Sequence, residues 1–515
     1  MLEALSALGG GFQTALSPQN LLFAFVGVFL GTVIGMLPGI GPINGIAILI
    51  PITFALDVDP TTMMILFAGI YYGSQYGNSI SAILLNVPGT ASSVATTLDG
   101  YEMAKRGRAG PALAMSAIAS FIGGTLAIFG LAFLAPLLAQ WAIRFGPAEY
   151  FVLIIFTFTT ISALTGKFFV KGLIATGIGL MLASIGLDPG TGSPRFTFGL
   201  LPLYDGIDFV SATIGLFAVA EVFLLLEQTR KGRQVRTAIG HAMISVREFW
   251  ESFWVMIRSA VSGFLVGVLP GAGATIAAFL AYSNEQRWVD KKGTFGEGDI
   301  RGVAAPEAAN NAAVSGALIP LLTLGVPGSG TTAVILAALL ALNLNPGPLF
   351  ISQQPDLFWG LIASMYIGNV MLLILNLPLI GLFIRILLIP RWVLVPGVAV
   401  IGYVAVYSVN GSVFDLMVMT GLGVMGYLMR KLNVPVAPVI LALVLGPLME
   451  TNLRRALSLA QGDWQVLFGS PITWVLWAMV AVSVVLPILT RRTPVAAMGP
   501  SAKEAEDEDT PTLND

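Results

Sequence analysis

The stretch that decides the fold is GMLPGIGPINGIAILIP, residues 35–51, in the middle of a long apolar run. The run extends from Leu21 to Leu56 and exceeds the roughly 20 residues with which one helix spans a bilayer. Its Pro and Gly residues interrupt a helix where water is absent, so the freed N–H and C=O groups need other partners. The sequence predicts two helical pieces that meet at residues 38–42, as a re-entrant hairpin tip or an unwound crossing. A plain Pro/Gly kink is the structural alternative.

Composition places this stretch in a membrane protein. The chain has 515 residues, of which 56% are hydrophobic and only 10% are charged, whereas soluble domains carry about 25% charge. Between Ala308 and Ile384 the only formal charge is Asp356. We therefore expect an all-α polytopic membrane protein with about a dozen transmembrane or re-entrant segments. Cysteine is absent and the formal net charge is −2, so neither thiolate chemistry nor a nucleic-acid partner is expected.

The opening stretch has a counterpart in the second half of the chain. GMLPGIG (35–41) recurs as GVLPGAG (267–273), and NVPGTASS (86–93) recurs as GVPGSGTT (325–332). A third pair, SAIASFIGG (116–124) and GLIASMYIGN (360–369), follows in the same order. The sequence therefore predicts an internal repeat with four Pro/Gly breaks.

The loops between these landmarks indicate that the two copies are inverted. Residues 56–62 of the first half carry no basic residue, whereas the equivalent loop 284–302 is rich in them. After the second landmark the pattern reverses, because residues 99–110 are basic and 342–356 contain no Lys or Arg. Since basic loops stay in the cytoplasm, equivalent loops should lie on opposite membrane faces. Inverted-topology repeats are typical of secondary transporters that open alternately to either side.

The sequence leaves open on which side of the membrane the C-terminus lies, because strict inversion places it outside whereas its charges suit the cytoplasm.

These patterns divide the chain into five parts. The expected parts are an N-terminal segment (1–17), a first inverted repeat (18–227), a cytoplasmic basic linker (228–250), a second inverted repeat (251–490) and a disordered acidic tail (491–515).

The four breaks are the candidate substrate site. Helices that stop at membrane depth expose N–H groups that attract anions, and hydroxyl side chains beside them can bind carboxylate oxygens without a buried charge. Helix capping and packing by small residues are the alternative interpretation. The candidate residues are Gly39, Gly41, Asn44, Pro88, Gly89, Thr90 and Ser92 in the first half, and Gly271, Gly273, Thr275, Pro327, Gly328, Ser329 and Thr331 in the second.

Two polar stretches upstream of the second breaks are the candidate cation site. YYGSQYGNSIS (71–81) and APEAANNAAVS (305–315) place polar side chains on one face of an otherwise apolar helix, and such a face meets a cavity or a partner. Glu307 is a candidate ion or proton ligand, although a helix that begins at Pro306 would also explain it. The candidate cation ligands are Asn78, Ser79, Glu307, Asn310, Asn311 and Ser315.

The motifs for other chemistries are missing from the sequence. It contains no HExxH metalloprotease helix and no Walker loop. We therefore expect neither an enzyme, a resident metal or cofactor, nor a nucleotide-driven pump.

Several of these blocks resemble a known family. GVFLGTVIGMLPGIGPINGIAILIP (27–51), YYGSQYGNSISAILLNVPGTASSV (71–94) and GVAAPEAANNAAVSGALIPLLTLGVPGSGTT (302–332) are similar to the large membrane subunit of the tripartite tricarboxylate transporters. The resemblance covers roughly residues 15 to 490. It implies a translocating subunit of the bacterial inner membrane, with a periplasmic substrate-binding protein and a small membrane subunit as partners. It also implies import of tricarboxylates or dicarboxylates, citrate among them, on a cation gradient, and by kinship an elevator mechanism.

The residues agree with this function and leave rivals open. Asn, Ser, Thr and backbone oxygens are hard ligands, which favours Na⁺ as the coupled cation. The alternatives are a proton-coupled carrier that uses Glu307, a passive channel for organic anions, and a membrane scaffold in which the breaks serve packing.

Overall fold

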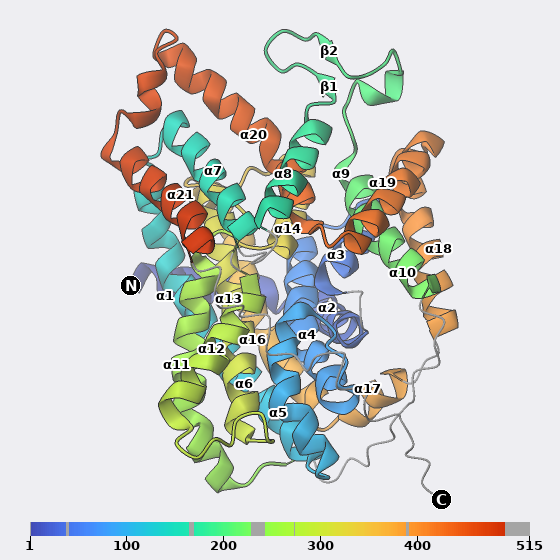
Figure 1. The fold of residues 1–515 in the computed structure, drawn as a ribbon, viewed down its shortest axis with the longest axis vertical. Coiled ribbons are helices and arrows are strands. Elements are labelled where there is room, and N and C mark those ends of the chain that lie inside the picture. The colour runs from blue at the N-terminus through green and yellow to red at the C-terminus, as the bar shows by residue number, and fades with distance from the viewer. Residues whose placement is uncertain are drawn as a thin grey trace, which may run out of the picture.

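A computed structural model describes residues 2–37, 41–163, 169–227, 243–271, 273–387 and 391–489. Most of these residues are helical (Figure 1). Within the described part, six helices are long and apolar enough to cross a membrane, and shorter apolar helices accompany them. The chain is therefore an all-α polytopic membrane protein, as its composition predicts. The expected acidic tail lies outside the described residues, as does most of the basic linker (228–242).

The first half of the chain holds one short strand pair among its helices. The strands are β1 (Gly186–Leu187) and β2 (Pro194–Arg195), which pair antiparallel. The helices are α1 (Leu2–Ala15), α2 (Pro18–Met36), α3 (Gly41–Ala55), α4 (Pro60–Leu85), η1 (Ala91–Ser93), α5 (Val94–Lys105), α6 (Ala109–Ala142), α7 (Pro147–Ala163), α8 (Phe169–Ala183), η3 (Leu201–Leu203), α9 (Phe209–Thr213), the π-helix η4 (Ile214–Val219) and α10 (Ala220–Glu227).

The described residues of the second half form helices joined by loops, without a strand. Its elements are α11 (Val246–Val268), α12 (Gly273–Val289), α13 (Ile300–Leu324), α14 (Gly330–Ala341), α15 (Phe350–Gln353), α16 (Pro355–Asn376), α17 (Ile380–Leu387), α18 (Arg391–Asn410), α19 (Val413–Lys431), α20 (Ala437–Leu459), η5 (Trp464–Phe468) and α21 (Pro471–Leu489).

Helices α2 and α3 form a hairpin around the break that opens the sequence analysis. The hydroxyl of Thr62 donates to Oδ1 of Asn20 at 2.6 Å, so α2 and α4 begin side by side. Helix α3 reaches the start of α4 through a short loop, and therefore returns to the end from which α2 set out. The expectation of two helical pieces around the break is confirmed, and of the two open geometries the chain adopts the hairpin.

Helices α11 and α12 form the second hairpin. The guanidinium of Arg258 on α11 binds the carboxylate of Glu285 on α12 through two hydrogen bonds of 2.9 and 2.6 Å. This contact makes the two helices antiparallel, with their turn between Val268 and Gly273. The break at residues 267–273 therefore lies in a helical hairpin, as its counterpart at residues 35–41 does.

Each hairpin packs against the helix that follows it, through glycines at matching positions. A Cβ on Gly35 would lie 2.1 Å from the carbonyl oxygen of Ser74, and a Cβ on Gly267 would lie 2.4 Å from that of Ala313. Such distances mean that backbone meets backbone, which only glycine permits at this separation. The same landmarks that align the two sequences thus carry the same helix contacts.

The third landmark helices are exchanged between the halves. Helix α6 of the first half packs against α13 of the second, and α16 of the second packs against α4 of the first. Asn369 on α16 binds both α4 and α6. It accepts a hydrogen bond from the hydroxyl of Tyr76 on α4 at 2.6 Å and donates to the carbonyl of Phe121 on α6 at 2.9 Å. The halves are therefore interlocked in one core.

Two loops that the charge pattern assigns to the cytoplasm lie together. The buried carboxylate of Asp99 on α5 accepts hydrogen bonds from the backbone N–H groups of Gly296 (2.9 Å), Gly298 (2.9 Å) and Asp299 (2.7 Å). Its second oxygen accepts from the hydroxyl of Tyr282 at 2.8 Å. We call this region, formed by residues 99–108, 245–248 and 284–302, the basic end; α5 and the start of α11 lie at the bottom of Figure 1.

The two loops without basic residues also lie together. A Cβ on Gly360, at the start of α16, would lie 3.3 Å from Cγ2 of Thr61, at the start of α4. Loop 56–59 therefore neighbours the loop that precedes α16. In both cases a loop that follows the first landmark of one half meets a loop that follows the second landmark of the other.

A second group of helices borders this core. Helices α7, α8, α20 and α21 pack together in the upper part of Figure 1, with β1 and β2 at the top. Arg195 of β2 binds Glu450 of α20 through two hydrogen bonds, and Arg454 binds Asp188 at 2.7 Å. The N–H of Thr191 and the guanidinium of Arg454 help to lower the pKa of Asp188 to about 2, so this anchor is charged at neutral pH. Helix α14 packs against α20 of this group, and α3 packs against α14 and against α18.

Candidate functional site

The hairpin tips meet the Pro-Gly turns in the middle of the core. Gly41 begins α3 with a φ of +61°, and the nearest atom to a Cβ there would be Cγ2 of Thr90 at 3.8 Å. Gly273 begins α12 with a φ of +63°, and the nearest atom would be Cβ of Ser329, also at 3.8 Å. We call the region around Gly41 and Thr90 the first tip, and that around Gly273 and Ser329 the second tip.

Four helices begin at these tips. Helix α3 faces the turn that leads into η1 and α5, and α12 faces the turn that leads into α14. The two tips also touch one another, because a Cβ on Gly330 would lie 2.9 Å from Cδ1 of Ile43, and α12 contacts η1. Helix N-termini carry partial positive charge and unpaired N–H groups, which attract anions. This convergence is suited to a carboxylate.

Neutral polar side chains form a connected cluster at the first tip. Nδ2 of Asn78 donates to the hydroxyls of Thr90 (2.7 Å) and Ser92 (3.2 Å) and to Oε1 of Gln75 (3.0 Å). Ser92 in turn donates to Oε1 of Gln75 at 3.0 Å, and its hydroxyl lies 2.8 Å from that of Thr90. Three oxygens therefore surround one amide nitrogen in a buried environment.

The second tip is closed by its own hydroxyls and by a tyrosine of the first half. Ser329 and Thr332 cap α14 reciprocally, with each side chain bound to the other's backbone N–H. The hydroxyl of Tyr71 on α4 lies 3.0 Å from that of Ser329. Thr331 is buried beside them.

The remaining predicted substrate residues lie along the same turns. The N–H of Gly271 donates to the carbonyl of Gly328 at 3.0 Å, which ties the second hairpin to its turn. A Cβ on Gly89 would lie 1.9 Å from the carbonyl oxygen of Gly35, so the first turn presses against the end of α2. The other members are Pro88, Pro327, Asn44, which is buried in the first turn of α3, and Thr275, which is half-buried in α12; Gly39 lies outside the described residues.

The predicted cation residues are not brought together as one group. Asn78 belongs to the first tip, whereas the hydroxyl of Ser79 accepts from Ser116 at 2.7 Å. Ser315 is hydrogen-bonded to the hydroxyl of Tyr72. Nδ2 of Asn311 donates to the carbonyl of its own helix at residue 307, at 3.1 Å. Side chains of the two polar stretches therefore form hydrogen bonds with different partners instead of surrounding one point.

Among the described residues, Glu307 has hydrogen-bond partners other than those of the first-tip cluster. Its carboxylate accepts hydrogen bonds from the hydroxyls of Thr96 on α5 and Ser120 on α6, the second at 3.3 Å. The reading in which a helix begins at Pro306 is wrong, because α13 begins at Ile300 and Pro306 lies inside it. Glu307 is thus a buried carboxylate that joins three helices.

Three residues of this site are not among the predicted ligands. Gln75 belongs to the polar stretch 71–81, and its carboxamide is central to the first tip. Tyr71 and Thr332 complete the second tip. The sequence does place Thr332 among the hydroxyls beside the second Pro-Gly turn, with Ser329 and Thr331, and at the spacing of a helix cap from Ser329. The role of Tyr71 depends on contact between the halves and leaves no local signal.

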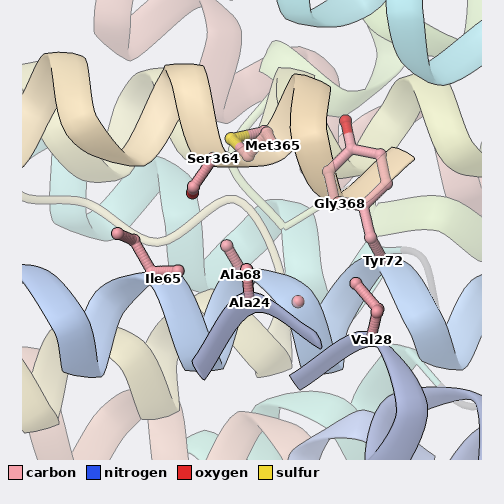
Figure 2. A pocket seen from close by; sticks show the side chains of 9 residues that line it. Ala24, Val28, Ile65, Ala68, Tyr72, Ser364, Met365 and Gly368 are labelled. Carbon is pink, nitrogen blue, oxygen red and sulfur yellow. The ribbon is translucent and has the colours of Figure 1, made fainter. Parts of the chain in front are cut away.

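An apolar crevice lies within the core between α2, α4 and α16 (Figure 2), and its lining contains none of the tip residues. Its lining includes Ala24, Val28 and Met365, with Ser364 and Tyr72 as the polar members. The hydroxyl of Tyr72 is already hydrogen-bonded to Ser315. A crevice without convergent polar groups offers no means of orienting a carboxylate, so the tips remain the candidate site.

Comparison with known proteins adds to this geometry. Residues 21–441 match the family described as "Tripartite tricarboxylate transporter TctA family". An uncharacterized 52.8 kDa protein in the TAR-I ttuC' 3' region of Agrobacterium vitis is 45% identical over 490 residues, which covers 95% of this chain and 97% of that protein. A protein in the TAR-II ttuC' 3' region of the same organism is 44% identical over 227 residues, covering 44% of this chain and 94% of that protein. No solved structure gives a significant match.

Proposed function

Because this chain belongs to the tripartite tricarboxylate transporter TctA family, we propose that it is the translocating subunit of a secondary active importer of tricarboxylates or dicarboxylates. The substrate is delivered by a periplasmic binding protein, and a small membrane subunit completes the complex in the bacterial inner membrane. Import is driven by a cation gradient, with Na⁺ as the coupled ion.

The convergence of four helix N-termini carries this proposal. A carboxylate placed between α3, η1, α12 and α14 would meet their partial positive charge without a buried cationic side chain. Thr90 lies beside Gly41 at the start of α3 and Ser329 lies beside Gly273 at the start of α12, and hydroxyls of this kind can donate to carboxylate oxygens. Gly41, Gly89, Gly273 and Gly328 keep the backbone close enough for N–H groups to take part.

An inverted repeat fits the arrangement of the loops. In each of the two loop pairs, a loop after the first landmark of one half neighbours a loop after the second landmark of the other. That exchange is expected when the copies have opposite orientations in the membrane, with the basic end in the cytoplasm. We propose the boundaries that the sequence predicts for the two copies, 18–227 and 251–490, with the linker 228–250 between them.

An elevator mechanism is the movement that we propose for this architecture. The hairpins, turns and interlocked helices α4, α6, α13 and α16 form one packed core, and the helices outside it, α7, α8, α20 and α21 as one group and α10, α18 and α19 as another, border that core. Movement of the core against the helices that border it would carry the site between the two faces of the membrane. Opening by repacking within the interlocked core would instead break its glycine contacts.

Uptake into proteoliposomes tests the function. Vesicles would contain this chain and its small subunit, with the binding protein and radiolabelled citrate, succinate or another carboxylate outside. We expect accumulation that requires an inward Na⁺ gradient. Uptake that persists after the Na⁺ and proton gradients are collapsed would contradict this proposal and indicate a channel. Uptake driven by a proton gradient alone would transfer the coupling role to Glu307.

A further inference from the structure

Side-chain oxygens are concentrated at the first tip. The oxygens of Gln75, Thr90 and Ser92 lie within 3.2 Å of one nitrogen, Nδ2 of Asn78. Thr90 and Ser92 are hydroxyls, so their hydrogens can turn away and leave lone pairs directed at a common point. Such a group of neutral oxygens is the ligand type that hard cations prefer.

One end of the Asn78 amide is left without a partner. The side chain is fully buried, yet its Oδ1 makes no hydrogen bond within the described part of the chain. Exchange of the amide oxygen and nitrogen would move the defect to the other end without removing it, because the neighbours lie on one side. Buried polar atoms without a partner are uncommon and indicate a missing ligand or strain. Here the unpaired atom is an oxygen beside three others.

Backbone carbonyl groups at the end of α2 add partial negative charge beside the first tip. The close approach of Gly89 places the C-terminal end of α2 against this turn, since the carbonyl oxygen of Gly35 and Cα of Asn78 both lie within 3.0 Å of a Cβ built on Gly89. The last carbonyls of a helix carry partial negative charge and favour a cation. This feature is independent of the side-chain cluster.

The second tip lacks the corresponding side chains. Counting back from the Pro-Gly pairs 88–89 and 327–328, Gln75 corresponds to Val314 and Asn78 to Ala317. A Cβ on Gly328 accordingly lies against Ala317, as one on Gly89 lies against Asn78. The second tip therefore keeps the fold of the first without its two carboxamides.

The two tips also differ in the residue that corresponds to Tyr71 in the other half of the chain. Tyr71 of the first half reaches Ser329 at the second tip. Its counterpart in the second half is Asn310, which should approach the first tip by the same correspondence. Asn310 is fully buried, and neither its Oδ1 nor its Nδ2 has a partner among the described residues. The second tip is thus contacted by the phenol of Tyr71, whereas the counterpart of that phenol is a shorter amide without hydrogen-bond partners among the described residues.

We propose that the chain binds Na⁺ at the first tip and not at the second. The ligands would be the oxygens of Asn78, Thr90, Ser92 and Gln75, with α2 carbonyls beside them and Asn310 opposite. This proposal rests on the proposed function, because it names the site of the coupled cation. It replaces a symmetric pair of ion sites with one site in one copy of the repeat.

Na⁺-dependent stabilisation of the purified chain tests the site. The melting temperature would be followed by tryptophan fluorescence in detergent while NaCl replaces choline chloride at constant ionic strength. A ligand that binds only the folded state raises the melting temperature with its concentration. We expect a saturable rise for the natural chain. Ser92→Ala should raise the half-saturating Na⁺ concentration at least about tenfold, because it removes one of the proposed oxygen ligands.

Two further variants make the test specific. Gln75→Val with Asn78→Ala gives the first tip the residues of the second, and should abolish the response in protein that stays monodisperse on size-exclusion chromatography. Ser329→Ala alters the second tip and should shift half-saturation by less than about twofold. An equal loss in Ser329→Ala and Ser92→Ala would contradict the single-site proposal, as would a natural chain that responds to Na⁺ no more than to choline. Gradient-driven uptake by the complete complex is measured separately, so failure of the site leaves the transport function to its own test.

Discussion

The hydroxyl of Tyr71 lies 3.0 Å from the hydroxyl of Ser329, which joins a helix of the first half to the second tip. Both residues are buried, and Ser329 also caps α14. The contact therefore connects the core helix α4 to a turn that we assign to substrate binding. Its removal should affect substrate affinity more than folding.

Tyr71→Phe tests that connection. The variant keeps the aromatic ring and removes one hydrogen bond, while Ser329 retains Thr332 as a partner. We expect stability to fall by only about 0.5–1.5 kcal/mol. The KM for carboxylate uptake should rise by about twofold to tenfold, because Ser329 loses the group that orients it. Tyr101→Phe, near the basic end, is the matched control, and an unchanged KM in Tyr71→Phe would contradict a substrate role for the second tip.

Asp99→Asn should destabilise the basic end. The amide oxygen can still accept from the three N–H groups of residues 296–299, but these bonds lose the carboxylate's charge and weaken, and Tyr282 must turn its hydroxyl to accept from the NH₂ group. A hydrogen bond to a charged group is worth about 1.5–3 kcal/mol, against about 0.5–1.5 kcal/mol for a neutral one. Thermal unfolding in detergent should show a drop of several degrees, whereas Glu102→Gln, which removes only an exposed ion pair with Lys105, should change little. Equal stability of the two variants would show that Asp99 is not a structural link.

Glycine substitutions at matching positions should have matching effects. Gly35→Ala and Gly267→Ala each place a Cβ within 2.4 Å of a facing carbonyl oxygen, so a hairpin must move away from its helix. Overpacking of this kind costs about 1–3 kcal/mol. Gly421→Ala in α19 has no atom within 4 Å of its Cβ and should be neutral or stabilising. Thermal stability and uptake of the three variants check this, and a harmless Gly267→Ala would remove the equivalence of the two hairpins.

Single cysteines test the inverted topology, since the chain has none of its own. Asp57→Cys and Ser352→Cys lie in the two loops without basic residues, and Arg106→Cys and Lys291→Cys lie at the basic end; all four positions are exposed. A membrane-impermeant maleimide applied to intact spheroplasts should label the first pair. The second pair should react only after the membrane is opened. Labelling of Asp57→Cys and Lys291→Cys from the same side would refute the inversion.

The sequence carried the local part of this structure and little of its long-range part. Pro38 to Pro42 identified where a helix stops, because ring geometry and missing donors act locally. It did not distinguish a hairpin from a crossing, since that depends on whether α3 returns beside α4. The helix face on which a side chain lies also did not predict its partner. Asn78 and Ser79 are neighbours in the sequence, yet Asn78 binds Thr90 and Ser79 binds Ser116.

The position of Glu307 shows the same limit. A Pro-Glu pair is typical of a helix start, but Asp299 caps α13 a full two turns earlier and its side chain accepts from the N–H of Arg301. The partners of Glu307, Thr96 and Ser120, come from distant segments. Periodicity within one helix does not contain that information, and it is the packing of α5 and α6 that supplies it.

The difference between Gln75 and Asn78 on one side and Val314 and Ala317 on the other has a consequence for direction. A duplicated chain with identical copies would be unchanged when its two faces are exchanged, and its inward- and outward-facing forms would have equal energy. Here the copies differ beside the turns that would bind the cargo. If the chain is the inverted-repeat transporter that we propose, its two forms are therefore unequal in energy, and its cycle has a preferred resting side that is set by the sequence before any gradient acts.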